Sequence, residues 1–506
     1  MRNQGLGSWT ARRARKSPQA TAVIHREVRY DYRELHARTL GRAAQLHAAG
    51  LRRGDRVAYL GPNHPAYLET LFAAGMLGAV FVPLNTRLVT SELAYCLTDS
   101  GSTLLVHTES CAGAAGAAAA EAEHALRLIS AETAVTAVAA GTEFDEPVGL
   151  DDPGIILYTS GTTGRPKGAV LSHGNLIWNA VNVVVDTDLA HDEVTLVSAP
   201  LFHTAALGMT CLPTLLKGGT VVLEEGFDEQ RTLEVIARYG VTLLFGVPAM
   251  YQRLADAPGF ADADLSSIRT LMCGGAAVPR TLIDRYLARG LDFVQGYGLT
   301  EASPGTLLLD AQHAVSKAGS AGMPHFFTDV RLAGAAADGA AAGDAGELRV
   351  QGPNVMLGYW GRPQETAQAL DDGWLRTGDL AVADADGYLR IVDRLKDLII
   401  SGGENISPAE VEEVFYQHPA VAECAVIGVP DERWGEVARA VVVIRTAHGP
   451  GDAAPAEDLA AQLLGFAAGR LAKYKVPKSV VFTESLPRSG AGKVLKSVLR
   501  EQHGKP

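Results

Sequence analysis

Cysteine is scarce in this sequence, and the few cysteines are isolated from one another. Among 506 residues there are five, none in a CxxC spacing: Cys96, Cys111, Cys211, Cys273 and Cys424. An odd number of scattered cysteines argues against a disulfide framework and against a cysteine-ligated metal site. We therefore expect reduced thiols and a cytoplasmic protein.

Long apolar runs are also missing. The most apolar stretch, LFAAGMLGAVFVPL (71–84), is shorter than the roughly 20 residues that a membrane-spanning helix needs. Its glycines and proline favour a buried helix that turns into a strand. Arg12, Arg13, Arg15 and Lys16 have no apolar run behind them, so we predict no secretory signal and no membrane span. A solvated helix face is the favoured interpretation of this basic cluster, with attraction to a membrane surface as the alternative.

The chain lacks an excess of positive charge. Its net charge of −12 argues against a general nucleic-acid binder, because such proteins neutralise phosphates with lysine and arginine. Any anionic ligand must therefore meet positive charge that is placed locally. A chain of this length is also too long for one hydrophobic core, so two or more domains are expected.

Short β-branched runs alternate with amphipathic helical patterns along most of the chain. Strand patterns occupy residues 55–60, 218–223, 241–247 and 267–273, and helical patterns occupy 231–240 and 279–290. This alternation predicts an α/β fold with largely parallel sheets. The alanine-rich stretch 111–126 fits a surface helix or a variable connection, and 333–347 fits a loose hairpin loop. The composition changes near residue 394, which predicts a separate small α+β domain behind a large one.

A strand pattern at 154–160 runs directly into glycines, hydroxyl side chains and a lysine, in the segment YTSGTTGRPKGAVLSH (158–173). Gly161 and Gly164 can expose backbone N–H groups, and Lys167 adds a mobile positive charge. Hydroxyl donors come from Thr159, Ser160, Thr162 and Thr163. Such a nest of donors suits a phosphate group. The spacing is not that of a Walker A loop, and by itself the segment fits an ordinary turn nearly as well.

The full string resembles the phosphate-loop signature of the adenylate-forming superfamily, which includes acyl-CoA synthetases, peptide-synthetase adenylation domains and beetle luciferases. The resemblance covers nearly the whole chain and is strongest to bacterial fatty-acyl and aryl CoA ligases. It implies a large N-terminal domain (1–394) of parallel-rich β-sheets layered with helices, together with a β-barrel-like subdomain. It also implies a small mobile α+β C-terminal domain (395–506), with a hinge near Lys396.

Three motifs take their roles from this resemblance. PLFHTAALG (200–208) places His203 at the mouth of an acyl pocket, as a gate and a neighbour of the carboxylate. MCGGAAV (272–278) sets Gly274, Gly275 and Ala276 beside an adenine. QGYGLTEAS (295–303) supplies the remaining groups of this side of the site, namely Gly296, Tyr297, Gly298, Thr300 and Glu301.

Each group of the third motif has an implied task. Tyr297 would stack on adenine, flanked by two glycines, and Thr300 would contact the α-phosphate. Glu301 would hold Mg²⁺, a hard cation that prefers oxygen ligands. Gly296 stands where enzymes for small acids often carry a bulky aromatic ring, so we expect an open pocket and a bulky hydrophobic acid. Read alone, each motif also fits an ordinary turn or a packed core loop.

The remaining roles fall near the end of the large domain and in the small one. GWLRTGDL (373–380) places Asp379 on the ribose hydroxyls, with Arg394 as a further donor. Gly402 and Gly403 would line a pantetheine tunnel. Lys493 matches a mobile lysine that contacts the carboxylate and the α-phosphate, although its loop reads GAGK where TGK is usual. For Trp434, stacking on coenzyme A and plain packing are equally good interpretations.

The resemblance implies an ATP-dependent acyl-CoA synthetase that uses Mg²⁺ and coenzyme A. The acid would first be joined to AMP with release of pyrophosphate, and then transferred to the thiol. The alternative is an adenylating enzyme that passes its acyl-AMP to a carrier protein or to a separate thiolating partner. A nucleotide-binding relative without catalysis is a third interpretation, disfavoured because the predicted site residues are all present. The partner is thus a small-molecule carboxylic acid, not nucleic acid, and a homodimer is left open.

Overall fold

The protein is described here by a computed structural model, in which the described residues form two compact units. Described are residues 2–133, 135, 144–159, 166–275, 278–334, 345–395, 397–401, 404–445, 456–488 and 494–504. Unit 1 comprises Met1–Val330 and Arg349–Arg376, and unit 2 comprises Arg331–Leu348 and Thr377–Pro506. The domain boundary near residue 394 stays a prediction.

Unit 1 contains a nine-stranded sheet whose central strands are parallel. Its order is β15 (Met323–Pro324), β14 (Gly305–Leu309), β13 (Phe293–Gly298), β12 (Thr270–Gly274), β11 (Leu243–Gly246), β9 (Val194–Val197), β10 (Thr220–Leu223), β1 (Thr21–His25) and β2 (Val28–Asp31). The pairs from β13 through to β1 are parallel, and β14, β15 and β2 add antiparallel edges. The sequence prediction of parallel-rich sheets is confirmed here.

A second sheet of unit 1 has seven strands. Its order is β18 (Gly358–Tyr359), β8 (Lys167–Ser172), β7 (Pro153–Thr159), β4 (Val80–Leu84), β3 (Arg56–Leu60), β5 (Leu104–His107) and β6 (Arg127–Ser130). The pairs from β7 to β6 are parallel, whereas β8 returns antiparallel to β7 and β18 pairs antiparallel with β8. The strand β18 thus joins a segment near residue 359 to the strand that begins at Lys167.

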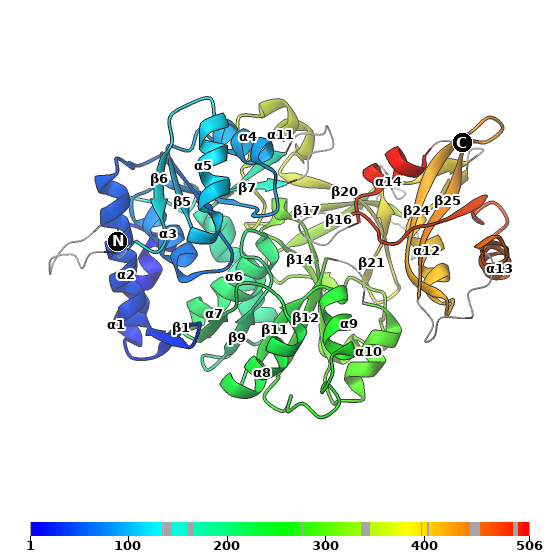
Figure 1. The fold of residues 1–506 in the computed structure, drawn as a ribbon, viewed down its shortest axis with the longest axis horizontal. Helices are drawn as coiled ribbons and strands as arrows, with labels where there is room; N and C mark the ends of the chain where they lie inside the picture. Colours follow the sequence, from blue (N-terminus) through cyan, green and yellow to red (C-terminus); the bar gives the residue numbers. More distant parts are fainter. Residues whose placement is uncertain are drawn as a thin grey trace. The chain divides into compact units, whose positions relative to one another are not determined.

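Helices cover both sheets and close three apolar cores. One core combines side chains from both sheets with those of α1 (Trp9–Lys16), α2 (Tyr32–Ala48), α3 (Pro65–Met76), α6 (His173–Asp186) and α7 (Leu212–Lys217). A second lies between the nine-stranded sheet and α8 (Glu229–Tyr239), α9 (Pro248–Asp256) and α10 (Arg280–Leu287). A third lies under α4 (Thr90–Ser100) and α5 (Ala112–Glu121). Figure 1 shows α8, α9 and α10 along one side of their sheet.

Residue alternation along the strands explains why one sheet can serve two cores. In β3, Val57 and Tyr59 belong to the shared core, whereas Ala58 and Leu60 belong to the core under α4 and α5. Successive side chains of a strand point to opposite faces, so a strand covered on both faces is apolar throughout. The stretch at 71–84 forms the end of α3 and all of β4, buried as expected.

A separate sheet runs in the order β16 (Asp329–Ala333), β17 (Gly346–Gln351), β20 (Trp374–Ala383) and β19 (Leu370–Asp371), with β21 (Leu389–Arg394) paired to β20. The pairs of β20 with β19 and with β21 are antiparallel. This sheet corresponds to the barrel-like subdomain that the resemblance predicts. The short helix α11 (Pro363–Ala369) precedes β19.

Unit 2 carries its own small core, as expected for an α+β domain. Its sheet runs β23 (Glu404–Ile406), β22 (Ile399–Ser401), β25 (Gly435–Ile444) and β24 (Val421–Asp431), with β26 (Ser479–Phe482) parallel to β25. The helices of this unit are α12 (Pro408–Tyr416), α13 (Ala456–Ala468) and α14 (Lys496–His503). Apolar side chains of α12, α13 and the sheet form a common cluster.

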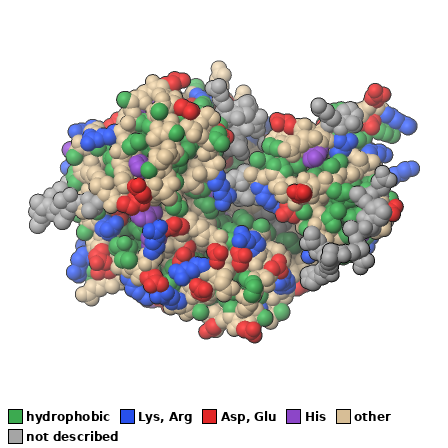
Figure 2. All heavy atoms as spheres, viewed as in Figure 1, with side chains coloured by type: hydrophobic (Ala, Val, Ile, Leu, Met, Phe, Trp, Pro, Cys, Tyr) green, Lys and Arg blue, Asp and Glu red, His purple; other side chains and the backbone are tan. Residues whose placement is uncertain are grey.

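The structure bears on three predictions about the whole chain, which concern its cysteines, its helices and its basic N-terminal cluster. All five cysteines are free thiols, and four of them are buried. No helix among the described residues combines the length and apolar character that crossing a membrane requires. The basic cluster forms α1, where Arg15 and Lys16 are exposed while the Arg13 guanidinium donates to the carbonyl of Leu216. Acidic and basic side chains are interspersed over the visible face of unit 1 (Figure 2).

Candidate functional site

The predicted phosphate loop is carried by the hairpin of β7 and β8. Thr159 ends β7 and pairs with Lys167, which begins β8, and the Thr159 hydroxyl lies 3.5 Å from the Lys167 carbonyl oxygen. The predicted loop segment therefore lies between two neighbouring strands of the seven-stranded sheet. Five predicted loop residues lie outside the described residues: Ser160, Gly161, Thr162, Thr163 and Gly164.

Two glycine segments meet at the ends of adjacent parallel strands. Gly274 of β12 is the register partner of Gly296 of β13. Gly275 has φ of +85°, a conformation in which glycine has no steric penalty. Gly298 is confined more strongly, because a Cβ there would lie 1.7 Å from the carbonyl oxygen of Pro304. Ala276 lies outside the described residues.

Within the described part of the chain, the space beside Gly296 is open. Apart from its own chain neighbours, the nearest described heavy atom to a Cβ built on Gly296 is the terminal methyl carbon of Met209, 4.0 Å away. Met209 belongs to η3 (Ala205–Cys211), a π-helical segment that continues into α7. His203 precedes η3 and accepts a hydrogen bond from the Leu207 N–H through its carbonyl (3.4 Å). Its ring lies edge-on to that of Phe202, with centroids 4.8 Å apart.

The η4 turn (Thr300–Ala302) carries two predicted site residues, Thr300 and Glu301, directly after β13. Tyr297, half-buried, lies on β13 between the two glycines. Glu301 accepts a hydrogen bond from the Tyr359 hydroxyl on Oε1 (2.8 Å), and the Lys167 ammonium lies 5.5 Å from the centroid of the Tyr359 ring. One tyrosine of β18 thus contacts both the lysine and the glutamate that the sequence predicts for the site.

Unit 2 brings Asp379 and Arg394 together. They are register partners across the antiparallel pair of β20 and β21, and Arg394 Nε lies 3.2 Å from Asp379 Oδ1. Asp379 is only 4% exposed, so its carboxylate is held where a guanidinium compensates its charge. The predicted arginine therefore contacts the predicted ribose-binding carboxylate directly.

The turn between β24 and β25 presents Trp434, which is 41% exposed. The Arg433 guanidinium lies 4.9 Å from the centroid of the Trp434 ring. The backbone N–H of Trp434 donates to Asp431 Oδ1 (2.8 Å). An aromatic ring beside a cation on the surface suits stacking on a nucleotide base. Four predicted residues of this region lie outside the described residues, namely Lys396, Gly402, Gly403 and Lys493.

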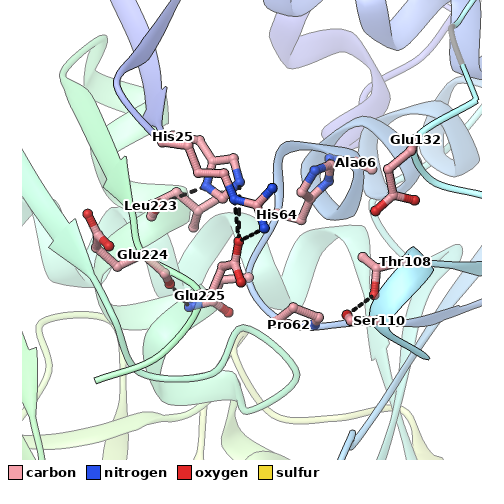
Figure 3. A network of polar contacts seen from close by, with 12 residues as sticks. His25, Pro62, His64, Ala66, Thr108, Ser110, Glu132, Leu223, Glu224 and Glu225 are labelled. Carbon is pink, nitrogen blue, oxygen red and sulfur yellow. Dashed lines mark hydrogen bonds and ion pairs between the residues drawn. The ribbon is translucent and has the colours of Figure 1, made fainter. Parts of the chain in front are cut away.

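A cavity of about 380 Å³ lies elsewhere in unit 1, around His25 and Glu225. Figure 3 shows the polar contacts that His25, His64 and Glu225 make there. The rings of His25 and His64 meet edge to face with centroids 5.1 Å apart, and His25 Nδ1 lies 2.9 Å from the Leu223 carbonyl oxygen. Burial lowers the pKa of His64 to about 4, so its neutral ring accepts a hydrogen bond from the Ala66 N–H (3.1 Å). None of the predicted site residues that the structure describes lines this cavity.

Comparison with known proteins decides the family. Residues 10–360 match the AMP-binding enzyme family, and residues 410–493 match the AMP-binding enzyme C-terminal domain. The chain belongs to the AMP-binding enzyme family. The superfamily that the motifs resemble is therefore confirmed, together with the class of AMP-forming acyl-CoA ligase.

Relatives of this AMP-binding enzyme match over their full lengths. A feruloyl-CoA synthase from Amycolatopsis sp is 58% identical over 504 residues, covering 100% of both chains. The long-chain-fatty-acid–CoA ligase FadD13 of Mycobacterium tuberculosis is 39% identical over 99% of both chains.

The fold also matches a solved relative. An o-succinylbenzoate CoA synthetase (MenE) from Bacillus subtilis, in complex with its acyl-adenylate intermediate, has a TM-score of 0.86 at 34% identity, covering 97% of this chain and 98% of that one. The same synthetase in complex with ATP and magnesium ion also superimposes with a TM-score of 0.86. The predicted α/β architecture is confirmed by these likenesses, while the roles of individual residues stay predictions.

Proposed function

We propose that this AMP-binding enzyme is an ATP-dependent acyl-CoA synthetase for a bulky aromatic carboxylic acid, with a hydroxycinnamic acid such as ferulate as the first candidate. The acid would attack ATP to give acyl-AMP and pyrophosphate, and coenzyme A would then displace AMP to give the thioester. The main support for this choice of acid is the open space beside Gly296. The full-length relation to a feruloyl-CoA synthase supports the same choice.

The acyl pocket takes its proposed shape from small residues. No side chain of β13 fills the space at Gly296, and Met209 bounds it at 4.0 Å from the position of a Cβ. Gly274 is more tightly enclosed, since a Cβ there would lie 3.1 Å from the Gly296 carbonyl oxygen and 3.5 Å from the Phe245 ring. Glycines next to apolar side chains such as Met209 and Phe245 leave room for a planar aromatic group.

The first half-reaction needs positioning and charge neutralisation rather than a general base. A carboxylic acid with a pKa of roughly 4 to 5 is already ionised at neutral pH. The obstacle is the approach of this anion to the anionic triphosphate. We assign its neutralisation to the Lys167 ammonium and to Lys493, and the contact with the α-phosphate to the Thr300 hydroxyl.

The donor set around Glu301 fits Mg²⁺. Its Oε1 accepts from Tyr359, and among the described residues its Oε2 has no hydrogen-bond or ion-pair partner. A single carboxylate that supplements phosphate oxygens is a usual protein contribution to a magnesium site. When bound, Mg²⁺ would draw negative charge away from the phosphate oxygens.

The second half-reaction belongs to unit 2. We propose that its movement about Lys396 removes Lys493 and presents Gly402 and Gly403 to the pantetheine arm. The exposed Trp434 ring is the proposed platform for the nucleotide of coenzyme A. A carrier protein as thiol acceptor is the alternative. Five free thiols support a location in the reducing cytoplasm.

The test is product analysis with the purified protein, ATP, Mg²⁺, coenzyme A and a panel of acids. The panel contains ferulate, indoleacetate, 2-succinylbenzoate, palmitate, acetate and malonate. We expect feruloyl-CoA, AMP and pyrophosphate, with kcat/KM for ferulate at least about 100-fold above that for acetate, a discrimination equivalent to about 3 kcal/mol. A preference for acetate or malonate would overturn the proposed acid. Accumulation of acyl-AMP with coenzyme A unconsumed would favour the carrier-protein alternative.

A substitution at Gly296 links the result to the pocket. Gly296→Phe fills the open space, so we expect kcat/KM for ferulate to fall by about 100-fold or more, the loss that misplacing a substrate by about 1 Å causes. The value for acetate should change little, because a two-carbon acid does not reach that space. Gly296→Ala is the matched control and should lie between the wild type and Gly296→Phe. Equal losses for ferulate and acetate would contradict the assignment of this pocket.

A further inference from the structure

A tyrosine that no motif singles out joins the two oppositely charged residues of the site. Tyr359 lies on β18, paired with Ala169 of β8 two residues after Lys167. Its hydroxyl donates to Glu301 Oε1 (2.8 Å), and the Lys167 ammonium lies 5.5 Å from its ring centroid. Among the described residues, Lys167 and Glu301 form no ion pair with each other.

We propose that Tyr359 is a positioning residue that orients the Glu301 carboxylate toward Mg²⁺ and holds the Lys167 ammonium on its ring face, keeping the two charges apart. This inference rests on the proposed function. If Lys167 and Glu301 paired directly, each charge would neutralise the other and be lost to the phosphates and to the metal. A phenol contacts both charged groups without neutralising either one, because its hydroxyl donates a hydrogen bond to the carboxylate and its ring face attracts the ammonium.

The hydrogen bond runs in the direction that this role needs. A phenol hydroxyl carries a proton, whereas an ionised carboxylate can only accept, so the Tyr359 hydroxyl donates to Glu301 Oε1 (2.8 Å). A carboxylate has about four lone-pair sites, of which this bond occupies one. A hydrogen bond of this kind to a metal ligand fixes the orientation of the ligand.

The backbone around Tyr359 is held firmly enough for such a role. Its N–H donates to the Thr366 hydroxyl (2.9 Å), which in turn donates to the Arg362 carbonyl (2.8 Å). The same segment is tied to the glutamate, because the Met356 N–H donates to the Glu301 carbonyl (2.8 Å). Both the side chain and the main chain of Glu301 are thus held by residues 356–359.

The test measures metal binding without turnover. Mn²⁺ replaces Mg²⁺ as a paramagnetic probe, and its binding to the protein with ATP present and no acid is titrated by electron paramagnetic resonance. Tyr359→Phe removes the hydroxyl and keeps the ring, so we expect Mn²⁺ affinity to fall by about 10-fold while ATP affinity at saturating Mn²⁺ is kept. Tyr359→Leu removes the ring as well and should also weaken ATP binding at saturating Mn²⁺.

Two controls separate this role from a structural one. Tyr32→Phe deletes another buried hydroxyl, which donates to the Gly219 carbonyl (2.7 Å), and should leave Mn²⁺ affinity unchanged. In a Glu301→Gln background, Tyr359→Phe should cost less than about 2-fold, because residues that act through one another are not additive.

Each outcome decides between the two proposals. Wild-type Mn²⁺ affinity in Tyr359→Phe, or an undiminished effect in the Glu301→Gln background, would overturn the role of Tyr359. If the wild-type protein adenylated no acid of the panel, the proposed function would fail instead.

Discussion

Replacing Gly298 by alanine would place a methyl carbon 1.7 Å from the Pro304 carbonyl oxygen and 2.7 Å from its carbonyl carbon. Ordinary van der Waals contact begins near 3.4 Å, so the overlap is larger than side-chain rotation could relieve. The obstacle is also backbone, and it is tied in place: the Leu299 N–H donates to the same oxygen (3.2 Å). Relief therefore requires β13 and the turn after η4 to separate.

The free-energy cost of Gly298→Ala can be estimated from two contributions. Overpacking a well-packed site typically costs about 1–3 kcal/mol, and a backbone obstacle should lie at the upper end. Loss of the hydrogen bond between Leu299 and Pro304 adds about 1 kcal/mol. We expect Gly298→Ala to destabilise this region by about 4 kcal/mol, which corresponds to about a 10³-fold change in its local opening equilibrium. Acyl-AMP formation should fall as well, because Tyr297 and Glu301 lie on either side of the distortion.

Hydrogen exchange measures the local opening directly. Amides of β13 and β14 should exchange about 10³-fold faster in Gly298→Ala than in the wild type. Gly296→Ala is the matched control, two residues away on the same strand, where the nearest described neighbour of the added methyl carbon is Met209 at 4.0 Å. Its amides should keep their protection. Protection within threefold of the wild type in Gly298→Ala, or equal losses in both variants, would refute the steric reasoning.

Two further predictions concern catalysis and pH. Lys493→Ala should slow acyl-AMP formation by at least about 10²-fold while thioester formation from supplied acyl-AMP continues; single-turnover pyrophosphate release measures the first step, and an undiminished rate would contradict the assigned role. Burial lowers the pKa of His173, which is 2% exposed, to about 4, so the unfolded chain binds this proton first as the pH falls below about 6.5. His173 should thus contribute about 3 kcal/mol of stability above pH 6.5 that is lost as the pH approaches 4. His173→Asn keeps an acceptor for the Leu6 N–H. Its free energy of unfolding, measured by urea titration, should therefore change less between pH 6.5 and pH 4 than that of the wild type. An unchanged pH dependence would contradict this.

Much of the candidate site could be predicted because its parts are local. The strand before the glycine-rich loop, the glycines of MCGGAAV and QGYG, and the carboxylate of Glu301 each lie within a short window of sequence. Strand and helix patterns are equally local, since alternation and helical periodicity repeat within a few residues. The family follows from the same strings, and the comparisons confirm it.

Contacts between segments that are distant in the sequence could not be predicted, because no local sequence pattern marks them. Nothing in LGYWGRP marks Tyr359 as a neighbour of Glu301 and Lys167, because that proximity arises from the pairing of β18 with β8. The contact of Arg394 with Asp379 likewise depends on the register of β20 and β21. The His25 and His64 cluster was not expected at all, since its members come from separate elements.

The amino-acid sequence alone determined the kind of chemistry: which residues can grip phosphate, hold a cation or lie flat against a ring, and in which order they follow one another. Tertiary structure alone decided which of these groups meet, why Gly298 tolerates no side chain, and which tyrosine lies between the opposite charges. The reason is physical. Functional groups belong to single residues, whereas distances between strands are set by the packing and register of the whole sheet.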